Sequence, residues 1–264
     1  MTAAISATST LAALTAIVAE AGALALRRWD EGFDSWEKAP GHPVCAVDLE
    51  VDAFLRERLG ALDPAAGWLS EESADNAARL ACRRVWVVDP IDGTRDYIRH
   101  RIGWCVSVAL VEDGRPVLAV LAAPARDELW SAAAGEGARR NGRLIHCGTR
   151  ANLAGARAPT DSLPREDRDL TIVAKPNSIA LRIAMVAADE ADLLATLRWG
   201  NEWDVAAAVL IASEAGAAVS DAFGVPLRFN QPVPRAFGVL ACVPGIHAAA
   251  VERLAGRAAT IRGG

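Results

Sequence analysis

Apolar residues recur with a helical period near the start of the chain. Residues 11–26 are apolar almost throughout, include Glu20, and run into Arg27 and Arg28. The stretch is shorter than the roughly 20 apolar residues that cross a bilayer, and no basic residue precedes it. We therefore predict an amphipathic helix and no membrane association. A second helix is predicted over residues 48–61, where an apolar stripe continues.

The middle of the chain has the pattern of consecutive strands. Residues 30–47 are punctuated by glycine and proline and are predicted to be irregular or hairpin-like. Runs rich in β-branched residues follow, separated by short turn sequences. Asn141-Gly142 is a signal for a type I′ hairpin. The strands predicted from these runs span 84–89, 104–112, 117–123 and 127–133.

The C-terminal part alternates between the two patterns. Helices are predicted over 178–188 and 203–215, and further elements near 170–174, 193–198, 217–220, 237–242 and 246–255. Mixed sheets between helical layers follow from this order, which predicts an α/β fold. We expect one domain over residues 1–264, with a first half to about residue 150 and a second half over 151–264.

Composition adds limits on location and partners. Hydrophobic residues make up 52% of the 264-residue chain, which is enough for a substantial core. A net charge of −5 argues against nucleic acid and anionic membranes as partners. The five cysteines are odd in number and scattered, so we expect reduced thiols and a cytoplasmic location.

One short run carries most of the candidate chemistry. Val85 to Val88 has the composition of a buried strand, and Asp89-Pro90-Ile91-Asp92-Gly93-Thr94 follows it directly. Pro90 has no N–H, so we expect strand pairing to end there. Asp92 stands at the position of an N-cap for a helix opened by Gly93 and Thr94. Carboxylates attract hard divalent cations, and free N–H groups at a helix start attract phosphate.

Two further acidic motifs flank this run. Glu71-Glu72-Ser73 follows an apolar stretch, and Trp203-Asp204 opens an alanine-rich helical pattern that reaches Glu214-Ala-Gly216. With these motifs and weaker matches in residues 38–48, the chain resembles the inositol monophosphatase superfamily of magnesium-dependent phosphatases. The resemblance implies a layered αβαβα sandwich of the inositol monophosphatase and fructose-1,6-bisphosphatase type. It also implies a homodimer and a small phosphorylated metabolite as substrate.

The resemblance assigns metal ligands to positions of this chain. It implies a site for Mg²⁺, with two or three ions, in which Asp89 bridges two of them. Glu71 and the backbone carbonyl of Ile91 would complete the first ion, and Asp92 and Asp204 the second. All of these ligands are hard oxygen donors, which suit magnesium.

Catalytic and phosphate-binding roles are assigned in the same way. The resemblance implies that the Thr94 hydroxyl contacts the attacking water, oriented by Asp48, and that Glu71 shares in catalysis. An alternative for Asp48 is a helix cap with no further role. The N–H groups of Gly93 and Thr94 would hold phosphate oxygens. The alternating acids Asp48, Glu50 and Asp52 lack the glycine of a calcium loop and are interpreted as an exposed helix face.

The leaving group is the least determined feature. Members of the superfamily that prefer inositol phosphates carry a glutamate shortly before Trp-Asp, but residues 194–200 contain no acid. Residues 178–182 instead resemble an element of bacterial bisphosphate nucleotidases, with Arg182 in place of lysine. Arg182 and Arg198 are therefore candidate contacts for a second phosphate, and the alternative is that both face solvent. Cys45 and Asp96 depart from the usual family residues.

These observations favour a magnesium-dependent 3′(2′),5′-bisphosphate nucleotidase. Inositol-1-monophosphatase is the nearest alternative, followed by phosphatases of histidinol phosphate or fructose 1,6-bisphosphate. An alternative of another class is a regulatory partner of the transcription machinery. The acidic set argues against a purely non-catalytic role, because a buried cluster of unpaired charges is costly to keep.

Overall fold

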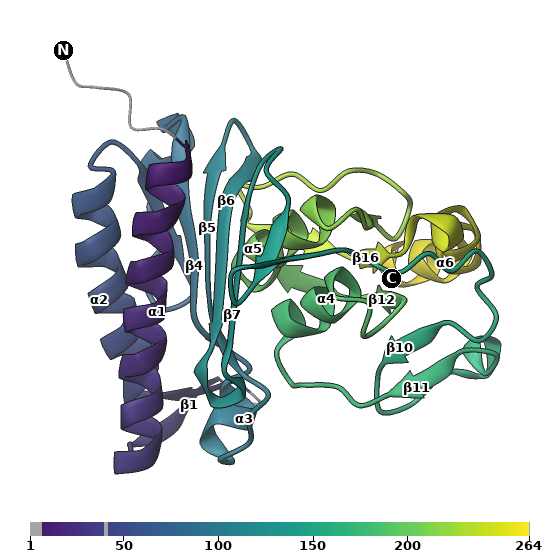
Figure 1. Ribbon diagram of the computed structural model, residues 1–264, viewed down its shortest axis with the longest axis horizontal. Helices are drawn as coiled ribbons and strands as arrows, with labels where there is room; N and C mark the ends of the chain where they lie inside the picture. The colour runs from purple at the N-terminus through teal and green to yellow at the C-terminus, as the bar shows by residue number, and fades with distance from the viewer. Residues whose placement is uncertain (1–6, 40–41, 264) are drawn as a thin grey trace.

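The computed structural model describes residues 7–39 and 42–263, and its layers are drawn in Figure 1. Helix α1 (Ala7–Glu31) lies beside α2 (Ala46–Leu62), and both cover one face of a large sheet. The hairpin expected between them is formed by β1 (Ser35–Ala39) and β2 (His42–Cys45), which pair antiparallel. Residues 9–31 of α1 are apolar and long enough to cross a membrane by length and composition alone. In the fold, Leu14, Val18 and Ala21 of this helix belong to the core.

The large sheet has seven strands in the order β3-β4-β5-β6-β7-β8-β9. Strands β3 and β4 are parallel, and every later neighbour is antiparallel. The turn between β8 and β9 contains Asn141 (φ 51°) and Gly142 (φ 77°), the two positive φ values of the predicted type I′ turn. The strands are β3 (Gly67–Ser70), β4 (Arg84–Asp92), β5 (Cys105–Glu112), β6 (Arg115–Ala123), β7 (Glu128–Ala133), β8 (Ala138–Arg140) and β9 (Arg143–Ile145).

Strand β4 continues beyond the point where pairing was expected to end. Asp89 pairs with Ser107 and Asp92 with Cys105, so β4 has one more residue than β5 between these pairs. Such a β-bulge leaves the extra residue outside the ladder. The missing N–H of Pro90 is therefore tolerated, and the prediction that Pro90 ends the pairing is wrong.

The other face of the large sheet is covered by α4 (Ile179–Ala187) and α5 (Glu202–Glu214). Beyond them lies a three-stranded sheet in the order β12-β16-β14, followed by α6 (His247–Gly263) (Figure 1). The sequence of layers is therefore helix, sheet, helix, sheet, helix, which confirms the predicted αβαβα sandwich. The small sheet consists of β12 (Leu193–Ala195), β14 (Ala218–Asp221) and β16 (Val239–Cys242).

Short elements complete the second half. Strands β10 (Arg157–Pro159) and β11 (Thr171–Val173) are parallel, and β13 (Trp199–Asn201) pairs antiparallel with β15 (Arg235–Phe237). At three or four residues, β3, β10 and β13 are too short to produce a readable alternation, and the sequence did not predict them. The 3₁₀ turns are η1 (Ala77–Ala81), η2 (Pro124–Arg126), η3 (Arg165–Asp167) and η4 (Pro244–Ile246).

Candidate metal and phosphate site

Three carboxylates meet where β3 and β4 end. Glu71 follows β3, Asp89 lies in β4 just before the bulge, and Asp204 lies in the first turn of α5. Glu71 N donates to Val88 O at 3.3 Å, which holds the chain after β3 against β4. Asn201 N donates to Asp204 Oδ2 at 3.0 Å and fixes that side chain. One carboxylate oxygen from each of the three acids lies within 4.8 Å of the others.

Burial and mutual repulsion make this cluster unfavourable without a counter-charge. Asp89 is only 2% exposed. Its pKa is raised well above the usual range, first by burial and then by the charges of Glu71, Asp92 and Asp204. Burial and the charge of Asp92 raise the pKa of Asp204 to about 7. A hard divalent cation would remove the repulsion, so these oxygen donors fit such an ion.

Asp92 faces the start of α4. Asp92 Oδ2 accepts hydrogen bonds from Ser178 Oγ (2.5 Å) and Ala180 N (2.7 Å), and Oδ1 accepts from Ile179 N (3.3 Å). The expected N-cap role before Thr94 is wrong, because Gly93 holds that position with φ 96°. The charge of Asp92 nevertheless raises the pKa values of Asp89 and Asp204. Asp92 therefore borders the cluster, and its role as a metal ligand stays a prediction.

Thr94 and Asp48, the pair expected to orient the attacking water, have separate hydrogen-bond partners. Thr94 Oγ1 donates to Ile91 O at 3.0 Å, which folds the turn onto the carbonyl expected to bind metal. Asp48 is buried near Asp89, since its charge contributes to the raised pKa of Asp89. Asp48 Oδ2 accepts from Cys45 N (2.8 Å) and Cys45 Sγ (3.0 Å). Burial and Asp48 raise the pKa of the Cys45 thiol, so this thiol remains a donor as a threonine hydroxyl would.

Gly93 allows the turn before α3, which is predicted to bind phosphate, to pack closely. A Cβ at Gly93 would lie 2.7 Å from Gly103 O and 3.0 Å from Ser178 N. Its φ of 96° lies in a region that L-residues rarely occupy. Helix α3 (Thr94–Ile98) begins at the next residue, so the N–H groups of Gly93 and Thr94 lie at its start.

The two candidate arginines differ in their contacts. Arg182 Nε donates to Pro176 O (2.9 Å) and Nη2 donates to Asn177 O (2.6 Å), so much of this guanidinium is engaged by the chain before α4. Arg198 lines a small niche that also contains Asp204, Gly200 and Asn201. Burial and the charge of Arg198 lower the pKa of Arg182, so the two cations lie close enough to repel each other.

The sequence interpretation missed two residues that support the site. Asp52 was interpreted as exposed, but it is 7% exposed and accepts from Ser70 Oγ (2.5 Å) and Ser73 Oγ (2.6 Å), on either side of Glu71. Its spacing of four from Asp48 was an available signal, because both lie on one helix face. Ser178 is the N-cap of α4 and donates to Asp92. The cap was recognisable before an apolar helical run, but the distant partner was not.

A layered α/β frame with clustered carboxylates beside a glycine turn at a helix start fits the class of metal-dependent phosphatases. The family model described as the inositol monophosphatase family matches residues 6–261, and the chain belongs to this family. It is therefore a hydrolase of phosphate monoesters, in a family that is generally metal-dependent.

Similar proteins cover most of the chain. The 3′(2′),5′-bisphosphate nucleotidase CysQ of Escherichia coli K12 is 31% identical over 211 residues, covering 75% of this chain and 84% of CysQ. The Nus factor SuhB of Xylella fastidiosa is 36% identical over 190 residues, covering 66% of this chain and 67% of SuhB. A solved structure of IMPase from Thermotoga maritima superposes with a TM-score of 0.79 at 26% identity, covering 94% and 97% of the two chains.

Replacing Gly93 with alanine tests the packing of the turn. We expect Gly93→Ala to lower the free energy of unfolding by about 1–3 kcal/mol, because the left-handed backbone and the close Gly103 carbonyl both oppose a Cβ. Phosphate release should fall as well. Urea unfolding and a phosphate assay measure the two effects. Gly60→Ala in α2 is the control, since a Cβ there meets nothing within 4 Å. Equal stability of the two variants would contradict this account.

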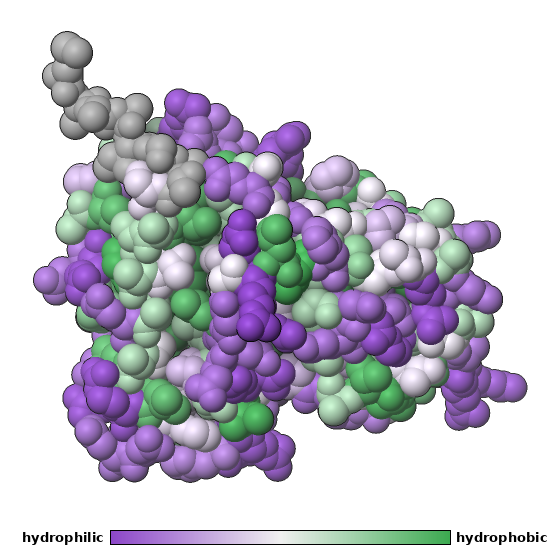
Figure 2. Space-filling view, in the orientation of Figure 1, coloured by the Kyte–Doolittle hydropathy of each residue, from purple (hydrophilic) through white to green (hydrophobic). Residues whose placement is uncertain are grey.

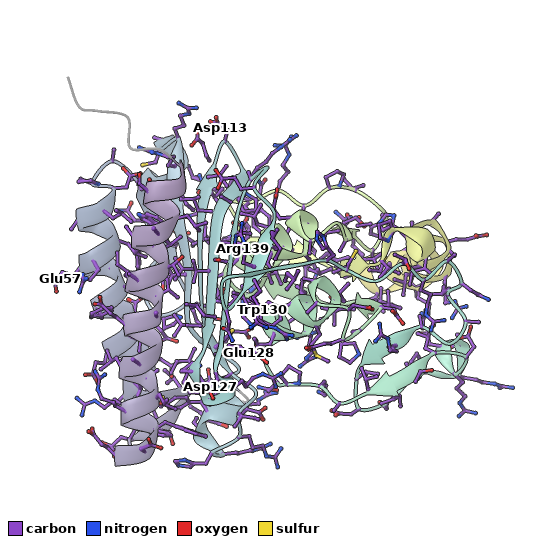
Figure 3. All side chains as sticks on the ribbon, in the orientation of Figure 1. Glu57, Asp113, Asp127, Glu128, Trp130 and Arg139 are labelled. Atoms are coloured by element: carbon purple, nitrogen blue, oxygen red, sulfur yellow. The ribbon has the colours of Figure 1, made fainter. Side chains whose placement is uncertain are left out.

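Replacing Asp89 with asparagine tests the charge cluster. Because Asp89→Asn removes a buried negative charge, we expect a higher melting temperature than wild type in EDTA. The variant should lose both the further stabilisation by magnesium and essentially all turnover. Thermal unfolding with and without magnesium measures this, with Asp113→Asn on an exposed turn as control (Figure 3). Magnesium stabilisation that survives in Asp89→Asn would exclude Asp89 as a ligand.

Proposed function

We propose that this phosphatase is a magnesium-dependent 3′(2′),5′-bisphosphate nucleotidase. The observation that carries the proposal is a pair of neighbouring guanidinium groups, Arg182 and Arg198, beside the acidic cluster. The charge of Arg198 partly offsets the rise in the pKa of Asp204, so Arg198 lies at the edge of the carboxylate cluster. A substrate with one phosphate on the metals and a second phosphate on the same molecule is complementary to this charge pattern.

The environment of Glu202 argues against inositol monophosphate as the preferred substrate. Glu202 is the only acid between residue 193 and Asp204. It is fully buried and accepts hydrogen bonds from Asn230 N (2.6 Å) and Gln231 N (2.9 Å). Its carboxylate is therefore engaged by the backbone and does not reach sugar hydroxyls. The similarity to CysQ points in the same direction, whereas the similarity to IMPase keeps inositol phosphate as the alternative.

Different residues of the site have different proposed roles in hydrolysis. Glu71, Asp89, Asp92, Asp204 and the Ile91 carbonyl would hold magnesium, which when bound would neutralise charge at the phosphate and acidify water. The N–H groups of Gly93 and Thr94 hold phosphate oxygens at the start of α3. The Thr94 hydroxyl, with Asp48 nearby, orients the attacking water. All five cysteines are free thiols, which agrees with the cytoplasm as the location.

Comparing substrates tests the proposal directly. With magnesium present, we expect kcat/KM for adenosine 3′,5′-bisphosphate to exceed that for inositol 1-phosphate, histidinol phosphate and fructose 1,6-bisphosphate by about tenfold or more. Release of inorganic phosphate from purified protein measures all four. A preference for inositol 1-phosphate would contradict the proposal. Absence of turnover with magnesium bound would favour a regulatory role like that named for SuhB.

Replacing Arg198 tests the second-phosphate contact. We expect Arg198→Met to raise KM for adenosine 3′,5′-bisphosphate about 10- to 100-fold and to leave KM for adenosine 3′-phosphate within about twofold. Arg139→Met on β8, whose position is labelled in Figure 3, is the matched control. An equal loss on both substrates would assign Arg198 to the shared phosphate instead.

A further inference from the structure

The connection between β10 and β11 leaves part of the second half uncovered. Parallel neighbouring strands need a crossover, which usually contains a helix that covers one face. Here residues 160–170 make this connection and contain only the single 3₁₀ turn η3. One turn is too short to cover the layer formed by β10, β12 and α4.

A cavity of about 150 Å³ lies at this point. It is bounded by β10, α4, β12 and α6 and by the shortened crossover. A cavity of this volume can accommodate an aromatic ring. Its polar lining includes the hydroxyl groups of Thr160 and Ser162 and the charged groups of Asp167, Arg182 and Arg253. The apolar lining comes mainly from Leu153, Leu163, Leu170, Leu193 and Leu254.

The cavity and the niche at Arg198 share a lining residue. Arg182 and Thr196 belong to its lining. Thr196 also lines the niche that contains Arg198 and Asp204. Arg182 therefore lines the leucine-rich cavity and lies close enough to Arg198, beside Asp204, for the two charges to interact.

We propose that this cavity binds the base of a nucleoside bisphosphate whose second phosphate lies at Arg182 and Arg198. The inference rests on the proposed function and adds to it a site that selects nucleotides over sugar bisphosphates. The aromatic faces of a nucleobase gain free energy by leaving water, and the hydroxyl groups of Thr160 and Ser162 can pair with its polar edge. Inositol, with a hydroxyl on every carbon, would leave polar groups unpaired there.

Filling the cavity tests the inference. Ala158 on β10 and Ala250 on α6 line it from opposite elements, so Ala158→Leu and Ala250→Leu each reduce its volume. We expect either variant to raise KM for adenosine 3′,5′-bisphosphate about 10- to 100-fold, and to leave KM for methyl riboside 3,5-bisphosphate, which lacks the base, within about twofold. Ala134→Leu in the exposed β7–β8 turn is the control.

A binding measurement separates this inference from the proposed function. Calorimetry in EDTA gives the dissociation constants of adenosine 5′-phosphate and methyl riboside 5-phosphate, and it requires no turnover. The base site is supported if wild type binds adenosine 5′-phosphate more tightly than methyl riboside 5-phosphate and if Ala158→Leu and Ala250→Leu both lose this difference. This result would hold even if catalysis prefers another substrate. Equal binding of the two compounds, or nucleotide binding that is unchanged in the filled variants, would overturn it.

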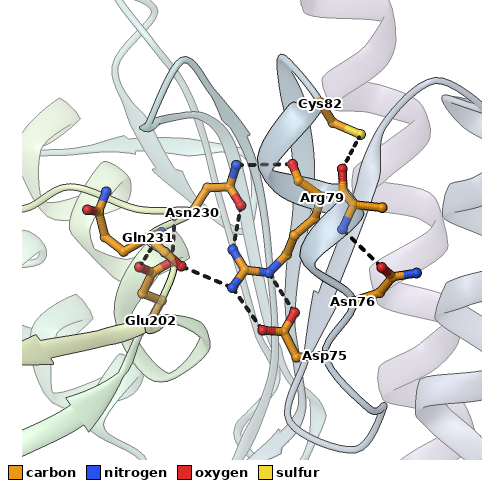
Figure 4. Close-up of polar contacts among 8 residues, drawn as sticks. Asp75, Asn76, Arg79, Cys82, Glu202, Asn230 and Gln231 are labelled. Carbon is orange, nitrogen blue, oxygen red and sulfur yellow. Dashed lines mark hydrogen bonds and ion pairs between the residues drawn. The ribbon is translucent and has the colours of Figure 1, made fainter.

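A separate observation concerns how the two halves meet. Arg79 in η1 has a side chain only 1% exposed and binds Asp75 through Nε (2.7 Å) and Nη2 (3.0 Å). It also donates to Asn230 Oδ1 (2.6 Å) and Gln231 O (3.0 Å), as Figure 4 shows. Glu202 holds the N–H groups of Asn230 and Gln231 from the other side. We call Asp75, Arg79, Glu202, Asn230 and Gln231 the inter-half bridge.

Each end of the inter-half bridge is close in sequence to a cluster carboxylate. Glu71 precedes Asp75 in the segment that leads into η1, and Asp204 lies in the same first turn of α5 as Glu202. A Cβ at Gly67 would lie 3.0 Å from Arg79 Cβ, so Arg79 also packs on the start of β3. We infer that the inter-half bridge sets the separation of Glu71 and Asp204, and that Arg79 and Asn230 are positioning residues for metal binding.

Two variants test this inference without removing a buried apolar group. Arg79→Lys keeps the charge but loses the forked geometry. Asn230→Gly keeps the left-handed backbone (φ 57°) but removes the acceptor. We expect each to raise the dissociation constant for magnesium about tenfold, with kcat at saturating magnesium within about twofold of wild type. The dissociation constant comes from magnesium-dependent thermal unfolding.

The controls distinguish positioning from stability alone. Arg83→Lys changes an exposed arginine four residues after Arg79 and should leave magnesium binding unchanged. Because Arg79 and Asn230 share a hydrogen bond, their effects should not add: the double variant should bind magnesium about as tightly as the single variant with the higher dissociation constant. A lower melting temperature with an unchanged dissociation constant in both variants would overturn the inference.

Discussion

Carboxylates held close together repel one another, and this repulsion constrains how the whole chain is arranged. Glu71, Asp89 and Asp204 come from three different parts of the chain, and burial adds a further cost for Asp89 and Asp204. The free energy that holds them together must come from apolar burial elsewhere. The large sheet supplies it on both faces, with one core beneath α1 and α2 and another beneath α4 and α5. The cluster is thus held by the most extensively packed part of the molecule.

Two local steric features, the bulge at Pro90 and the missing Cβ of Gly93, shape the candidate site at the end of β4. The bulge at Pro90 redirects β4 without ending its pairing, so Asp89 and Asp92 have separate environments. Asp89 faces the other acids, whereas Asp92 is held by the start of α4. Gly93 removes the Cβ that would keep these layers apart. One run of residues thereby contributes a cluster carboxylate, a link to the opposite half and a closely packed glycine turn at the start of α3.

The sequence predicted the features that depend on neighbouring residues. It did not predict side-chain environments that depend on contacts between residues distant in the sequence. Helix α5 was predicted to within one residue at each end, because an apolar run between caps is a local signal. The carboxylates could be assigned because their motifs are contiguous and resemble a known family. The orientation of Asp92 could not be predicted, because its partner Ser178 lies far along the chain. Asp52 was wrongly taken as exposed for the same reason: only tertiary packing brings Ser70 and Ser73 to it.

The distance in sequence between Glu71 and Asp204 has a consequence for the order of folding. Strands β3 to β9 can pair through mostly local connections, and they carry Glu71 and Asp89. Helix α5 must then close a long loop to bring in Asp204, and this closure has an entropic cost that local contacts do not offset. During synthesis, the first half therefore emerges with two acids of the cluster and without the third. The site is complete only after the second half has left the ribosome and docked, so a nascent chain is not yet a phosphatase.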